Sequence, residues 1–187
     1  MRSFWRQFRP AILILLVMTL LCGAVYTGAM TAIAQLAFPR QANGSLITVT
    51  LKDGTQRTYG SALIAQAFTK PEYLVGRPMT VSNLSPVSGA QAKLVRERID
   101  WWRHFDPENK AEIPADLVTG SGSGVDPYIS PEAAAYQAAR IAAARNMPKK
   151  DVQAVIDKYT TGRFLGFIGE PAVNVLKVNL ALDGLIQ

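Results

Sequence analysis

The chain has 187 residues, 49% of them hydrophobic, and its 20 basic and 14 acidic residues give a net charge of +6. Arg2, Arg6 and Arg9 supply half of that excess, and the 17 basic and 14 acidic residues that remain are mixed along the chain. No run of Lys and Arg favours a nucleic-acid partner, and no cysteine other than Cys22 is present to form a disulfide.

The first element is a run of 30 uncharged residues, 10–39. About 20 apolar residues in a helix cross the ~30 Å hydrocarbon core of a bilayer, so this run predicts a transmembrane helix. A secretory signal is the alternative, with Ala32-Ile33-Ala34 resembling a cleavage site. Its apolar region is only about 7–15 residues long, which favours an uncleaved anchor in contact with membrane lipid.

Positive charge predicts the orientation of this helix. Cytoplasmic flanks carry the excess of Lys and Arg, and residues 1–9 hold three arginines. We therefore expect residues 1–9 in the cytoplasm, a single span over residues 10–39, and residues 40–187 as one extracytoplasmic domain. Ala24, Gly28 and Ala32 recur every four residues and predict a stripe of small side chains for helix packing in the membrane.

The next residues predict a β-hairpin and then a short helix. Apolar and polar residues alternate over Ser45–Tyr59, and Asp53-Gly54 favours a turn in which both residues have positive φ. Ser61 is a candidate N-cap for a short helix that ends before Pro71.

Helices are predicted at three later positions. Residues 91–102 have apolar side chains near helical spacing, and residues 131–145 are rich in alanine. Ser130 is expected to cap this second helix, and Asn146 to end it. Residues 151–159 predict a third helix.

A glycine–serine loop precedes the alanine-rich helix and is the one candidate site for a nucleotide. It consists of Gly120, Ser121, Gly122, Ser123 and Gly124. Glycine loops can direct backbone N–H groups at phosphates, but the Lys-Ser/Thr pair that follows the last glycine of a Walker loop is missing here. The alternative is a turn that needs glycine for its backbone angles, in which Gly122→Val is expected to be more damaging than loss of both serine hydroxyls.

No catalytic residue and no metal-ligand set is predicted. His104 is the single histidine, and no cysteine lies near it. The last element, residues 171–183, is rich in Val and Leu and predicts a buried strand that pairs with the early hairpin. Together these elements predict a small α+β domain behind one transmembrane helix.

Several motifs together resemble a known family. The transmembrane run, SALIAQAF, GRPM, LVTGSGSGVDPYISPEAAAYQAAR and GEPAVNVLKVNLALD occur here in the order found in KdpC, the C subunit of the bacterial potassium-importing P-type ATPase. The resemblance covers nearly the whole chain, and Leu117–Gln137 and Gly169–Asp183 are its most specific parts. It implies a single-span subunit of the bacterial cytoplasmic membrane that assembles with channel-like KdpA, ATP-hydrolysing KdpB and the small subunit KdpF.

The resemblance leaves two functions open. In the first, the chain is a non-catalytic accessory subunit that stabilises the complex and binds no cofactor itself, while ATP, Mg²⁺ and K⁺ are handled by the other subunits. In the second, it is a catalytic chaperone that contacts nucleotide and raises the ATP affinity of the ATP-hydrolysing subunit. Because ATP is cytoplasmic, the side of the membrane on which the glycine–serine loop lies discriminates between them.

Overall fold

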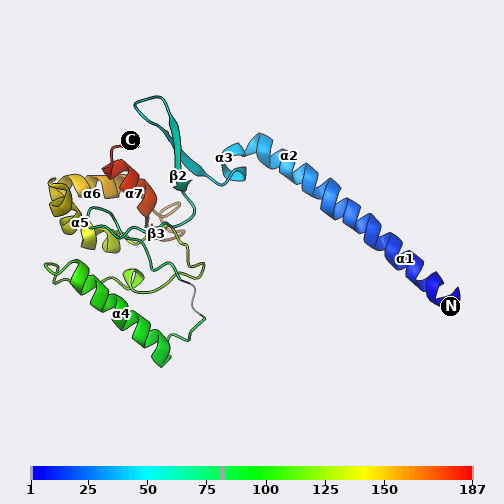
Figure 1. Cartoon of the computed structure of the whole chain (residues 1–187), viewed down its shortest axis with the longest axis horizontal. Helices are drawn as coiled ribbons and strands as arrows, with labels where there is room; N and C mark the ends of the chain where they lie inside the picture. The colour runs from blue at the N-terminus through cyan, green and yellow to red at the C-terminus, as the bar shows by residue number, and fades with distance from the viewer. Residues whose placement is uncertain (1, 81–82, 187) are drawn as a thin grey trace. The chain divides into compact units, whose positions relative to one another are not determined.

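The computed structural model describes residues 2–80 and 83–186, and the chain divides into two compact units between Leu46 and Ile47. Figure 1 shows a helical first unit and a mixed second unit. The elements of the first unit are α1 (Arg2–Met18), the π-helix η1 (Thr19–Tyr26), α2 (Thr27–Ala37) and α3 (Pro39–Ala42). The second contains β1 (Leu46–Thr50), β2 (Gln56–Ser61), α4 (Gly89–Phe105), the 3-10 helix η2 (Ala115–Leu117), β3 (Tyr128–Ile129), α5 (Pro131–Arg145), α6 (Lys149–Lys158), β4 (Thr160–Thr161), β5 (Ala172–Asn174) and α7 (Val175–Leu182). The chain is therefore α+β, as predicted.

The first unit contains a helix that is long and apolar enough to cross a membrane, over Phe8–Ala37. None of it is buried within the chain, so its Leu, Ile and Val side chains are exposed. Its central part has π rather than α hydrogen bonding, and the Thr27 hydroxyl donates to the Cys22 carbonyl across it at 2.9 Å. The prediction of one apolar helix of spanning length is confirmed.

The early hairpin is confirmed, with a different turn. β1 and β2 pair as a two-stranded sheet, and Leu51 donates its N–H to the Thr55 carbonyl at 2.8 Å. Gly54 has φ +83° but Asp53 has no positive φ, so the expectation that both do is wrong. The Asp53 carboxylate instead accepts hydrogen bonds from the hydroxyl and N–H of Thr55, which lower its pKa.

The three predicted central helices are confirmed. The Ser88 hydroxyl accepts from the Gln91 N–H at the start of α4, and the Ser130 hydroxyl accepts from the Ala133 N–H at the start of α5. Asn146 ends α5 in the left-handed conformation, which a short polar side chain tolerates. α6 begins at Lys149, just before its predicted start.

No helix follows Ser61, so that prediction is wrong. Ser61 ends β2, and residues 62–80 form turns and irregular backbone. The backbone of this segment bonds to side chains of α5 and α7 instead. Gln137 of α5 pairs with both backbone groups of Val75, and Asn179 of α7 pairs with both backbone groups of Leu74, at 2.7–2.9 Å.

The predicted strand over residues 171–183 is also wrong. Only Ala172–Asn174 is extended, and the Asn174 side chain then caps α7 by accepting from the Lys177 N–H at 3.0 Å. β5 lies between β3 and β4 in an antiparallel sheet, with Ile129 and Thr160 both opposite Val173. It does not pair with the hairpin, which forms a sheet of its own.

The core of the second unit lies around α5. α6 packs against α5 and α7 against α6, and Figure 1 shows these three helices grouped together. Ala133, Ala134 and Ala138 of α5 have no exposed surface, and their small side chains permit the close approach of α6. The core includes Leu74, Trp102, Leu117, Ile129, Ala133, Ala134, Ala138, Ile141, Val152, Ile156, Val173 and Val178.

Candidate functional site

The glycine–serine loop is closed by hydrogen bonds between its own residues. Gly124 donates its N–H to the Ser121 carbonyl at 3.2 Å. The Ser123 hydroxyl accepts from the Val125 N–H at 3.2 Å, and the Ser121 hydroxyl accepts from the Asp126 N–H at 3.4 Å. The N–H groups of Gly124, Val125 and Asp126, at the end of the loop, are thus engaged with oxygens of Ser121 and Ser123.

Two of the three glycines are required by the backbone. A Cβ on Gly120 would lie 2.8 Å from the Thr80 carbonyl oxygen, closer than carbon and oxygen can approach. Gly124 has φ +72°, which glycine adopts without steric cost. Gly122 has no positive φ and open space around it, so the backbone angle that was the reason to expect Gly122→Val to be more damaging than loss of both serine hydroxyls is absent.

Arg77 links the loop to the irregular segment 62–80. Its guanidinium donates to the Gly120 carbonyl at 3.3 Å and to the Thr119 carbonyl at 3.5 Å, and it lies 3.9 Å from the Asp126 carboxylate. Ala65 adds a second link by donating its N–H to the Val125 carbonyl at 2.9 Å. The positive charge of Arg77 is therefore engaged with the loop itself.

A cavity of about 540 Å³ lies beside the loop, and most of its charged groups are acidic. Asp116, which lines it, accepts from the Ser130 N–H at 2.7 Å and from the Ser130 hydroxyl at 3.2 Å. A carboxylate thus already occupies the approach to the N-terminus of α5, where a phosphate would otherwise be favoured. The charged lining residues are Arg77, Asp116, Asp126, Glu132 and Glu170.

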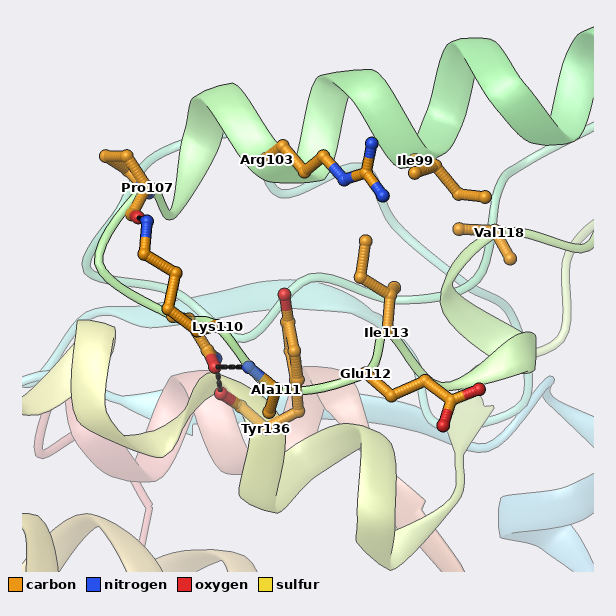
Figure 2. Close-up of a pocket in the computed structure, with 10 residues that line it drawn as sticks. Ile99, Arg103, Pro107, Lys110, Ala111, Glu112, Ile113, Val118 and Tyr136 are labelled. Carbon is orange, nitrogen blue, oxygen red and sulfur yellow. Dashed lines mark hydrogen bonds between the residues drawn. The ribbon is translucent and has the colours of Figure 1, made fainter.

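A second cavity, of about 620 Å³, lies between α4, residues 107–113 and α5 (Figure 2). The hydroxyl of Tyr136 and the side chain of Ile113 point toward α4 in this view. Burial, and then the charge of Asp106, raise the pKa of Tyr136. Arg103, Lys110 and Glu112 supply charge at its walls, and sequence reasoning did not identify any of these residues.

The side chains that position this region were also not predicted. Besides Gln137 and Asn179, two arginines of α5 bind the carbonyls of residues 71–73. Arg140 bonds to those of Pro71 and Tyr73, and Arg145 to that of Glu72 at 2.7 Å. Burial lowers the pKa of Arg140 to about 10. One sequence signal could have identified these side chains. Gln137, Arg140 and Asn179 are polar residues at positions where the apolar spacing of their helices predicts core-facing side chains.

The remaining sequence-based candidates lie elsewhere. Ala24 is in the π-helical η1 and Gly28 and Ala32 are in α2, all exposed, so their role in helix packing stays a prediction. His104 is exposed and its Nδ1 lies 2.7 Å from the Asp100 carbonyl oxygen. Among residues 2–80 and 83–186, no group of three or more His, Cys, Asp and Glu side chains is placed to hold a metal ion.

Comparison with known proteins identifies the family. Residues 8–184 match the family described as "KdpC: K+-transporting ATPase, c chain". A Listeria monocytogenes protein named "Potassium-transporting ATPase KdpC subunit" is 52% identical over 99% of both chains. Proteins of the same name from Methylococcus capsulatus and Clostridium botulinum are 50% and 45% identical, over 96% and 100% of this chain. The chain therefore belongs to the KdpC family, the c chain of the K⁺-transporting P-type ATPase.

Proposed function

We propose that this chain is a non-catalytic accessory subunit of ATP-driven potassium import. In this role it is held in the bacterial cytoplasmic membrane by the apolar helix and stabilises the assembly of channel-like KdpA, ATP-hydrolysing KdpB and the small subunit KdpF. The observation that carries the proposal is the closed glycine–serine loop: its own serine oxygens accept from backbone N–H groups, and carboxylates surround the adjacent cavity.

The charges of that cavity oppose direct nucleotide binding. Four carboxylates and one guanidinium line it, so a phosphate placed there would meet a net negative wall. Arg77, the one cation, is directed at loop carbonyls and Asp126. ATP, Mg²⁺ and K⁺ are therefore assigned to the other subunits, and this subunit binds no cofactor of its own.

The orientation we propose places residues 1–9 in the cytoplasm and residues 40–187 outside. Arg2, Arg6 and Arg9 precede the apolar helix, and no acidic residue offsets them there. This orientation keeps the glycine–serine loop away from cytoplasmic ATP.

Cysteine labelling in intact cells tests the proposal. In a Cys22→Ala background, Ser121→Cys is expected to react with a membrane-impermeant maleimide added outside, whereas Ser3→Cys is expected to react only after the cells are opened. The reverse pattern would place the loop in the cytoplasm and favour the catalytic chaperone. In the accessory role, the purified full chain is also expected to show no saturable ATP binding by calorimetry.

The small-residue stripe is proposed as the contact of the helix with its partners. Close packing at small side chains supplies much of the association between helices in lipid. Gly28→Leu is therefore expected to release the chain from a complex purified through another, tagged subunit, whereas Leu15→Ile is expected to retain it. Equal retention of both variants would assign assembly to residues 40–187 instead.

A further inference from the structure

We propose that Phe164–Ile168, which we call the apolar tip, inserts into an apolar pocket on another subunit of the ATPase. This inference rests on the proposed accessory function. The side chains of Phe164, Leu165 and Phe167 are 68%, 70% and 74% exposed, and that of Ile168 is 49% exposed. These neighbouring apolar residues lie outside the apolar helix Phe8–Ala37.

Contiguous exposed apolar residues are uncommon on a folded domain and mark an interaction surface. Single exposed Leu or Val residues are ordinary, and Val87, which is 95% exposed, is one example. The apolar tip differs because four of its five residues are large and apolar, and two of these are aromatic. Aromatic side chains bury a large area at little cost in conformational entropy, as anchors of protein interfaces do.

The backbone holds the apolar tip in a defined shape. Phe164 and Ile168 form an antiparallel bridge in which each donates its N–H to the carbonyl of the other, at 2.8 and 2.9 Å. Below the bridge, Arg163 and Glu170 form an ion pair at 2.7 Å. Leu165 at the turn has φ +52°, a conformation that a bulky residue rarely adopts.

These features favour a protein pocket over a lipid surface. A bilayer accepts apolar side chains in any arrangement, so it gives no reason for a strained leucine at the turn. A protein pocket fits one arrangement of side chains, and a backbone that already holds this arrangement loses less conformational entropy on binding. Binding to anionic lipid also uses free basic residues, but the one cation of residues 162–170, Arg163, is paired with Glu170.

Dissociation of the purified complex tests the proposal. Phe167→Ser is expected to speed release of the full chain from the detergent-purified ATPase about 30-fold, the effect of removing a hot-spot aromatic. Val87→Ser is the matched control and is expected to leave release unchanged, and both variants are expected to unfold at the wild-type temperature. If the wild-type chain never co-purifies with the other subunits, the proposed accessory function is wrong. If the wild-type chain co-purifies and Phe167→Ser dissociates as slowly as wild type, the apolar tip is not an anchor.

A fluorescent label separates a protein pocket from lipid. Phe167→Cys in a Cys22→Ala background is labelled with bimane and placed in vesicles of phosphatidylcholine and phosphatidylglycerol. We expect the emission to shift to shorter wavelength only when the other subunits are reconstituted with the chain. A shift of the same size in vesicles that contain the chain alone would identify lipid as the partner, and no shift in either sample would show that the apolar tip stays in water; both results would overturn the proposal.

Discussion

Replacement of Asn179 by leucine is predicted to destabilise the second unit strongly. The Asn179 side chain accepts from the Leu74 N–H at 2.7 Å and donates to the Leu74 carbonyl at 2.9 Å, and both residues are almost fully buried. Leucine has the same branched arrangement of four side-chain heavy atoms, although it is bulkier, and it leaves both backbone groups without a partner. Each unsatisfied buried group costs about 1–3 kcal/mol, so we expect a loss of about 3 kcal/mol after the gain from burying leucine.

Thermal unfolding of the full chain in detergent measures this loss, with tryptophan fluorescence as the signal, because Trp102 is buried in the second unit and becomes exposed on unfolding. For a unit of this size, about 3 kcal/mol lowers Tm by about 10 °C. Gln153→Leu, which removes an exposed amide, is the control and is expected to keep the wild-type Tm. A Tm for Asn179→Leu within about 2 °C of wild type, a loss of less than about 1 kcal/mol, would mean that the Asn179 amide does not stabilise the backbone of Leu74.

Charge provides a second test at the same position. Asn179→Asp keeps an acceptor for the Leu74 N–H, but an ionised carboxylate would face the Leu74 carbonyl. Burial raises the pKa of an aspartate at such a site, so the stability of this variant is highest when the carboxyl is protonated and is lost as the pH rises. The difference in Tm between wild type and Asn179→Asp is therefore expected to be smaller at about pH 4, near the ordinary aspartate pKa, than at neutral pH.

Two further predictions concern the loop and the alkaline stability of the same unit. Gly124→Ala places a side chain at φ +72° and is expected to cost about 1–2 kcal/mol in thermal unfolding, whereas Gly122→Ala, in open space, is expected to cost almost nothing. Burial, and then the hydrogen bond to Asp183, raise the pKa of Tyr73 above its ordinary value, so its neutral form stabilises the fold below about pH 10 and this contribution is lost as the pH rises further. The decrease in Tm between about pH 9 and 11 is accordingly expected to be smaller for Tyr73→Phe than for wild type.

The elements that could be predicted from the sequence are those fixed by local interactions. The cap at Ser130, the alanines of α5 and the stop at Asn146 all act within one helix, and the alternating strands of the hairpin act across a single turn. Local patterns also predicted that a glycine-rich turn precedes α5. They could not show which glycine is needed, because Gly120 is constrained by Thr80, far from it in the chain.

The elements that were missed depend on partners distant in sequence. A short helix was predicted between Ser61 and Pro71, but residues 62–80 follow an irregular path, in which side chains of α5 and α7 bond to the backbone of Leu74 and Val75. In VNVLKVNLAL, Val and Leu favour a strand, but the apolar residues also fit one side of a helix, and the Asn174 cap favours the helix. No periodicity indicates the apolar tip, because its exposure is decided by the tertiary structure.

The glycine–serine loop and the apolar tip are joined through one small sheet. β3 follows the loop, β5 follows the apolar tip and its flanking Glu170, and the two strands pair directly, with Tyr128 opposite Asn174. Glu170 belongs to both regions, since it forms the ion pair with Arg163 and also lines the cavity beside the loop. Because β3 and β5 are hydrogen-bonded to each other, we expect a partner that fixes the apolar tip also to restrict the loop.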